Sequence, residues 1–268
     1  MGNNAPIGVF DSGVGGLTVA REIMRQMPRE RIVYFGDTAR VPYGSKSKDT
    51  IIGFSRQIAK FLQTKNVKAI VIACNTATAF ALDTIQKELD IPVLGVVKPG
   101  ADVAAEVTKN GRIGIIGTKG TVNSNIYRNY LHELNPEFLV FQRACPLFVP
   151  LVEEGWIYDS VTIEVAERYF SELKAYGIDT LVLGCTHYPL IRHVLQKIIG
   201  KDVTLVNPAY ETARRLKAVL TEKDLIANKL EGEHLFYVSD GAEAFKMFAN
   251  SILPCNVQKT SDVNIEQY

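Results

Sequence analysis

The sequence lacks the features of several large classes of protein. Its 30 basic and 29 acidic side chains nearly cancel, so it has no cationic surplus of the kind that binds nucleic acid. No apolar run reaches the roughly 18 residues of a candidate membrane span. The start, Met1 to Pro6, has neither the basic residues nor the apolar core of a signal peptide. We therefore expect a cytoplasmic protein with no nucleic-acid partner and no membrane association.

Cysteine is scarce as well. Four cysteines in 268 residues are not a disulfide scaffold, and in a reducing compartment they are expected to be thiols. None belongs to a CxxC pair or a Cys/His cluster with zinc-site spacing, so no metal is expected. Cys145 and Cys255 lie in no distinctive context, and we interpret both as structural.

Short apolar runs alternate with amphipathic segments along the whole chain. Runs rich in β-branched residues are typical of buried parallel strands, and amphipathic segments between them predict crossover helices. The predicted strands lie near 7–10, 32–36, 69–73, 92–96, 113–117, 138–142, 180–184, 203–206 and 235–238. The predicted helices lie near 17–27, 50–64, 77–89, 100–109, 121–134, 159–176, 189–199, 209–220 and 241–251. This alternation predicts an α/β fold of parallel sheets.

The two parts of the chain resemble each other. Ile7–Gly13 aligns with Ile113–Lys119, and Cys74 then aligns with Cys185 in the same order. An internal repeat of this kind predicts two pseudo-symmetric α/β domains that face each other across an active-site cleft. The final residues contain too few elements for a third unit and are expected to pack back on the first domain. We predict that residues 1–97 plus 207–268 form one domain and residues 98–206 the other.

Cys74 and Cys185 each follow a predicted strand, at the edge where open α/β sheets place ligand chemistry. Each also precedes a predicted helix, whose N-terminal N–H groups lower the pKa of a nearby thiol. Two equivalent thiols suit a reaction in which one thiolate removes a proton from a carbon and the opposite thiol returns one to the other face. Racemisation is such a reaction. The alternative is that both are buried structural cysteines.

Polar residues beside these thiols are further candidates. The pairs Asn75-Thr76 and Thr186-His187 suit either the binding of a carboxylate or the capping of a helix. His187 also lies two residues from Cys185, where an imidazole can control the ionisation of the thiol.

Three other segments come from the turns of the predicted sheets. Asp11 and Ser12 open a glycine-rich turn, and Asp11 can receive a substrate ammonium or tune a thiol. Tyr43-Gly44 lies in a loop that can cover the cleft, and Glu153 occupies the corresponding loop of the second repeat. Ordinary turns and exposed loops remain the alternative for all three.

Together these motifs resemble the glutamate racemases over essentially the whole chain. The matching segments are Ile7–Gly16, Val41–Gly44, Ala73–Ala77 and Leu183–Pro189. The resemblance implies a cofactor-independent, homodimeric enzyme that interconverts L- and D-glutamate and supplies D-glutamate for peptidoglycan. It implies that Cys74 acts on D-glutamate and Cys185 on L-glutamate. The implied catalytic residues are Cys74, Cys185, Asp11, His187 and Glu153, and the implied substrate contacts are Asp11, Ser12, Tyr43, Gly44, Asn75, Thr76, Thr186 and His187.

Two alternatives stay open. Aspartate racemases resemble this chain around both cysteines but usually carry an acid after the second Cys-Thr, where this sequence has His187. A two-lobed amino-acid-binding protein without catalysis would share the architecture but would not need a thiol on each face. The sequence departs from the glutamate racemase pattern at Val238–Gly241 and at Lys98, and both departures lie outside the matching segments.

Overall fold

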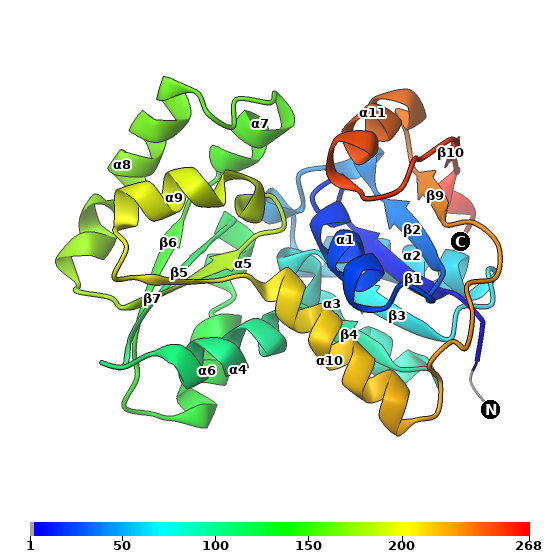
Figure 1. Cartoon of the computed structure of the whole chain (residues 1–268), viewed down its shortest axis with the longest axis horizontal. Coiled ribbons are helices and arrows are strands. Elements are labelled where there is room, and N and C mark those ends of the chain that lie inside the picture. The colour runs from blue at the N-terminus through cyan, green and yellow to red at the C-terminus, as the bar shows by residue number, and fades with distance from the viewer. Residues whose placement is uncertain (1–2) are drawn as a thin grey trace.

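The computed structural model describes residues 3–268, which form two parallel-sheet α/β domains (Figure 1). The six-stranded sheet has the order β10-β9-β2-β1-β3-β4, and the four-stranded sheet has the order β6-β5-β7-β8. The first contains β1 (Ile7–Asp11), β2 (Ile32–Gly36), β3 (Ala69–Ile72), β4 (Val93–Gly95), β9 (Leu235–Val238) and β10 (Thr260–Asp262). The second contains β5 (Arg112–Gly117), β6 (Leu139–Ala144), β7 (Thr180–Gly184) and β8 (Thr204–Val206). We call the two units the large-sheet domain and the small-sheet domain.

Helices cover both faces of both sheets. The large-sheet domain packs α1 (Leu17–Gln26), α10 (Pro208–Glu222) and α11 (Ala242–Ile252) on one face, and α2 (Lys48–Gln63) and α3 (Asn75–Glu88) on the other. The small-sheet domain packs α7 (Phe148–Glu153), α8 (Ser160–Ala175) and α9 (Arg192–Ile199) on one face, and α4 (Val97–Val107) and α6 (Ile126–Leu134) on the other. The short helix α5 (Lys119–Asn123) follows β5. Single 3-10 turns are η1 (Thr38–Arg40), η2 (Tyr43–Ser45), η3 (Tyr188–Ile191) and η4 (Ile265–Gln267).

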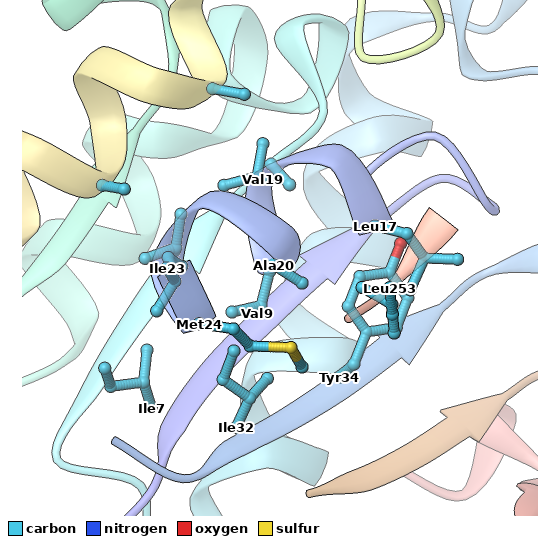
Figure 2. Packing of buried hydrophobic residues seen from close by; sticks show 14 of the residues in the cluster. Ile7, Val9, Leu17, Val19, Ala20, Ile23, Met24, Ile32, Tyr34 and Leu253 are labelled. Carbon is cyan, nitrogen blue, oxygen red and sulfur yellow. The ribbon is translucent and has the colours of Figure 1, made fainter. Parts of the chain in front are cut away.

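Strand side chains alternate between the two faces, as the pleat of a strand requires. In β1, Ile7 and Val9 pack under α1, whereas Phe10 packs under α2 and α3. Figure 2 shows the first of these layers, in which Ile23 and Met24 of α1 face the strand side chains Ile7, Val9 and Ile32. Because both faces are covered, the central strands β1, β3 and β7 are buried along their whole length and consist mainly of apolar residues. For this reason the positions of these strands could be predicted from apolar runs in the sequence.

The two sheets have the same topology. The order β2-β1-β3-β4 in one domain corresponds to β6-β5-β7-β8 in the other, and all pairings within these sets are parallel. Cys74 follows β3 and Cys185 follows β7, so the two cysteines end equivalent central strands. Strands β9 and β10 extend the large sheet beyond β2. The predicted α/β class with two parallel-sheet domains is confirmed.

Helix α10 lies between the domains, with α1 on one side and α4 on the other (Figure 1). Its buried residues Ala213 and Leu216 belong to the core of the large-sheet domain. The boundaries after residues 97 and 206 remain a prediction, with which the assignment of strands to sheets is consistent. In residues 3–268 no helix is both long enough and apolar enough to cross a bilayer.

Two local predictions were wrong, and two elements were missed. The single helix predicted over 121–134 is two helices, because Asn125 adopts a left-handed conformation with φ of 56° between α5 and α6. The helix predicted from 189 begins as the 3-10 turn η3 and becomes α-helical only at Arg192. Helix α7 and strand β10 were not predicted, because α7 is a six-residue helix that contains Pro150 and β10 has only three, largely polar residues.

Candidate active site

A cavity of about 450 Å³ lies where the carboxyl ends of the two sheets meet. Both Cys74 and Cys185 line it, and each thiol-bearing residue is only 6% exposed. A larger cavity of about 800 Å³ lies around α3, α4 and α10, but neither cysteine lines it. The chemistry expected of paired thiols therefore belongs to the smaller cavity. Its wall is formed by residues of both domains: Ser12, Gly13, Val41, Pro42, Tyr43, Gly44, Ser45, Cys74, Asn75, Thr76, Thr118, Lys119, Pro146, Val149, Pro150, Glu153, Gly184, Cys185, Thr186 and His187.

Cys74 is the N-cap residue of α3. Its Sγ accepts a hydrogen bond from the Ala77 backbone N–H at 3.4 Å. Burial, and to a smaller extent the neighbouring Asp11 carboxylate, raise the pKa of the Cys74 thiol to about 12. The prediction of a pKa lowered by the helix N-terminus is wrong here, because desolvation outweighs the single hydrogen bond from Ala77. Cys74 is therefore a protonated thiol at neutral pH.

Cys185 has a different environment. No α-helix begins directly after it, since the next residues form η3, so the predicted helix N-terminus is absent there. Instead its Sγ lies 3.8 Å from Nδ1 of His187, whose Nε2 lies 2.9 Å from Oε1 of Glu153. Burial alone lowers the pKa of His187, but its hydrogen bonds to Cys185 and Glu153 reverse this and raise the pKa to about 10. Cys185 thus faces an imidazolium, whereas Cys74 faces an acid.

The link between Glu153 and His187 gives a testable titration. We expect Glu153→Gln to lower the pKa of His187 from about 10, because the charge that Glu153 places beside the ring is lost. The shift is modest because the Glu153 side chain is 40% exposed. The pKa is raised in the folded state, so this pair stabilises the fold fully below the ordinary histidine pKa, and the contribution is lost as the pH rises through about 10. The measurement is an NMR titration of the His187 ring. Glu154→Gln, an exposed neighbour, is the matched control and should leave the titration unchanged, whereas an unchanged curve in Glu153→Gln would refute the link.

Asp11 lies under the cavity rather than in its wall. Its carboxylate accepts hydrogen bonds from the Gly13 N–H at 3.0 Å and from the Thr186 hydroxyl at 3.5 Å. Burial raises the pKa of Asp11, and the charge of His187 opposes that rise. Asp11 therefore links the first turn of the large-sheet domain to the segment that follows Cys185.

The same two segments touch directly. The Thr18 hydroxyl donates to the Thr186 carbonyl oxygen at 3.0 Å. A Cβ at Gly15 would lie 2.3 Å from Oγ1 of Thr186 and 2.5 Å from Nδ1 of His187, so only glycine fits there. Within the glycine-rich turn, Gly15 therefore allows close packing against the other domain, whereas Gly13 lines the cavity.

The loop 41–45 forms another part of the wall. The Tyr43 hydroxyl donates to the buried Asp37 carboxylate, which Arg40 also contacts through Nε at 2.8 and 2.9 Å. The guanidinium of Arg40 lies 3.9 Å from the centre of the Phe54 ring. Because the hydroxyl of Tyr43 is already paired, this residue offers the cavity its backbone and ring rather than a free polar group.

Asn75 and Thr76 begin α3 and face partners from the small-sheet domain. The Asn75 side-chain oxygen lies 2.7 Å from the hydroxyl of Tyr127. The Thr76 hydroxyl lies 2.8 Å from that of Thr118 and 3.2 Å from that of Thr121. Hydroxyl and amide groups of both domains therefore interlock at the N-terminus of α3.

The structure brings nearly all of the residues predicted from the sequence into this one cavity. Cys74, Cys185 and eight others line it, and Asp11 alone lies just behind the wall. Thr118 also lines the cavity but was not predicted, although the repeat alignment places it opposite Ser12 and so carried the signal. Val149 and Pro150 of α7 were not predicted either. They give the wall an apolar side that nothing in their local sequence marks as functional.

Comparison with known proteins identifies the family to which this chain belongs. The family model described as Asp/Glu/Hydantoin racemase matches residues 7–216. The chain belongs to this family. The glutamate racemase of Geobacter metallireducens is 49% identical over 261 residues, which cover 97% of each chain. Within the family, the solved glutamate racemase isoform RacE1 of Bacillus anthracis has a TM-score of 0.94 at 42% identity and covers 98% of both chains.

A third relative was solved with a ligand. The structure of glutamate racemase from Francisella tularensis in complex with D-glutamate has a TM-score of 0.93 at 40% identity, with 99% of both chains covered. The resemblance to glutamate racemases stated from the sequence motifs is thus confirmed.

In residues 3–268 no group of three or more His, Cys, Asp or Glu side chains is arranged to hold a metal ion.

Proposed function

We propose that this protein is an isomerase that interconverts L- and D-glutamate by proton transfer at Cα between two thiols. The observation that carries the proposal is that Cys74 and Cys185, which end equivalent strands of the two domains, line one cavity. The reaction needs a base on one face of Cα and an acid on the other, and it needs no further group to carry a proton. Relatives at 40–49% identity that are glutamate racemases support glutamate as the substrate.

The unequal surroundings of the thiols suggest their resting states. The imidazolium of His187, held by Glu153, lies beside the sulfur of Cys185, where its charge favours the removal of a proton by that sulfur. Cys74, whose pKa is raised, holds its proton. In this state Cys185 removes the Cα proton of L-glutamate and Cys74 donates its own proton to the opposite face, which gives D-glutamate. The reverse reaction starts with Cys74 as the base, after proton exchange.

The polar wall suggests how the substrate is held. The N-terminus of α3 presents backbone N–H groups and the side chains of Asn75 and Thr76, which suit the α-carboxylate. The substrate ammonium carries a charge opposite to that of Asp11, and Ser12 lies beside it in the wall. The backbone of Tyr43-Gly44 and the Thr186-His187 pair complete the proposed set of substrate contacts. Together they fix Cα between the two sulfur atoms, which is the positioning that proton transfer requires.

The biological setting follows from the activity. D-Glutamate is a component of peptidoglycan, so we propose a role in cell-wall synthesis and a cytoplasmic location, where the precursor is assembled. We also propose that the protein works as a homodimer. Sedimentation velocity of the purified chain tests this last point, since a sedimentation coefficient that fits a 29.7 kDa particle at all concentrations would contradict it.

Circular dichroism tests the proposed reaction. Pure protein in D₂O is mixed with L-glutamate or with D-glutamate, with no added cofactor. We expect the signal of either enantiomer to decay to zero while deuterium enters Cα. Racemisation of aspartate but not glutamate would support the aspartate racemase alternative, and a constant signal with both amino acids would favour a binding protein without catalysis.

A further inference from the structure

Tyr127 is a buried residue of α6 that reaches the active site of the neighbouring domain. Its side chain is 0% exposed, and its hydroxyl lies 2.7 Å from Oδ1 of Asn75, the first residue of α3. Asn75 lines the cavity, whereas Tyr127 does not. The hydrogen bond therefore runs from the small-sheet domain to a cavity-lining residue of the large-sheet domain.

This bond determines which way the Asn75 amide points. A carboxamide has an acceptor oxygen at one end and a donor NH₂ at the other. The oxygen is taken by Tyr127, and the NH₂ donates to no other group in residues 3–268. The nitrogen is also not among the sealed, unpaired polar atoms of the described chain. It is thus a free donor on a residue of the cavity wall.

Tyr127 is well placed to hold this orientation. A Cβ at Gly184 would lie 3.2 Å from Cε2 of the Tyr127 ring, and a Cβ at Gly100 would lie 3.5 Å from its hydroxyl oxygen, so the ring is packed between β7 and α4. Burial raises the pKa of Tyr127 further above its already high ordinary value, so the phenol keeps its proton and stays a donor. A reversed amide could only donate its NH₂ to the phenol oxygen. That would leave the buried O–H without its acceptor, because in residues 3–268 the oxygen of Asn75 is the only group to which Tyr127 donates.

We propose that Tyr127 is a positioning residue that turns the NH₂ of Asn75 toward the carboxylate of the bound substrate. The inference rests on the proposed function, because it takes a carboxylate as the group that Asn75 receives. A carboxylate accepts hydrogen bonds only, so a reversed amide would meet it with its oxygen and repel it. Tyr127 itself does not line the cavity, and in residues 3–268 its hydroxyl bonds only to Asn75.

The inference predicts an effect on binding rather than on proton transfer. Without the phenol O–H, the amide of Asn75 is free to rotate, and part of the population presents the wrong end. We expect Tyr127→Phe to raise KM for both enantiomers by about tenfold, the effect of losing one hydrogen bond to a charged group, and to change kcat by less than about twofold. The two enantiomers should respond equally, because both present the same carboxylate.

A matched control and a second variant separate positioning from general damage. Tyr169→Phe removes another tyrosine hydroxyl of the small-sheet domain, one that lies 3.3 Å from the Leu147 N–H and outside the cavity wall, so KM should not change. In an Asn75→Ala background, Tyr127→Phe should raise KM no further, because the amide that it orients is gone. Thermal unfolding of each variant reports whether it is folded.

The results distinguish this inference from the proposed function. If the wild type does not racemise glutamate, the proposed function fails. If the wild type is active and KM of Tyr127→Phe is unchanged, or rises equally in the Asn75→Ala background, the inference is overturned. If Tyr127→Phe does not fold, Asn75→Asp tests the same point, because it keeps an acceptor for Tyr127 but has no NH₂. An unchanged KM in Asn75→Asp would then overturn the inference.

Discussion

Cys74→Ala is expected to slow racemisation by about 10²- to 10⁴-fold in both directions, the contribution of one acid/base group. Both directions suffer because each needs a base on one side of Cα and an acid on the other. Circular dichroism of L- and D-glutamate measures the rates. Deuterium uptake adds a sharper readout, since Cys185 still removes and returns the proton of L-glutamate on its own face. We expect residual deuterium exchange into L-glutamate without inversion, and almost none into D-glutamate.

Cys145→Ala is the control for this experiment. Cys145 is a fully buried thiol of the small-sheet domain that does not line the cavity, and its carbonyl oxygen, which accepts from Tyr188, is unaffected by the change. The rate should stay close to that of the wild type. Racemisation at the wild-type rate in Cys74→Ala would rule out the two-thiol mechanism, and exchange confined to D-glutamate would reverse the assignment of the thiols.

Lys68→Met should destabilise the fold by about 3–5 kcal/mol, the typical cost of leaving one partner of a buried ion pair alone. Lys68 precedes β3, and its Nζ lies 2.6 Å from Oε2 of Glu30, with both side chains at most 2% exposed. Its Nζ also donates to the carbonyl oxygens of Asn3 and Leu225, at 2.5 and 2.7 Å. The pair therefore ties the segment before β9 to the start of β3, the strand that Cys74 follows. Urea unfolding followed by far-ultraviolet circular dichroism measures the loss.

Two further variants test the cause of that loss. Adding Glu30→Gln to Lys68→Met removes the stranded charge and keeps an acceptor for the Ala227 N–H, which lies 2.8 Å from Oε1 of Glu30. We expect the double variant to recover much of the stability. Lys229→Met, which breaks an exposed pair with Glu231, should leave the unfolding midpoint unchanged. No recovery in the double variant would show that the stability comes from packing rather than charge.

Burial on both faces explains how much of the fold was predictable. Strands such as Thr180–Gly184 are continuous apolar runs, so their position and their parallel pairing followed from the sequence. The break at Asn125 did not, because the residues on each side keep a helical pattern and only the backbone angle separates α5 from α6. Strand β10 could not be predicted, because three residues are too few to show a periodic pattern. It forms by parallel pairing with β9, which the sequence does not reveal.

The part of the site that could be predicted is the part in which the two repeats align. Cys74 and Cys185 stood out because two strands end in the same way, and their neighbours followed from proximity. The raised pKa of Cys74 could not be predicted, because it depends on burial and on the Asp11 carboxylate. Asp11 lies 63 positions away in the sequence and is a neighbour of Cys74 only in the fold. Tyr127 was missed for the related reason that an aromatic residue on an apolar helix face is typical of a core. Only the contact with Asn75 distinguishes it.

The different neighbours of the two sulfur atoms have a thermodynamic consequence. Mirror-image amino acids have equal free energies in water, and forward and reverse reactions share one transition state, so kcat/KM must be identical for the two enantiomers. Asp11 on one side and His187 on the other can make the two bound complexes unequal, but cannot bias the final mixture. Any enantiomer that is bound more tightly must therefore be turned over more slowly by the same factor. A net flux toward one hand can come only from consumption of that product.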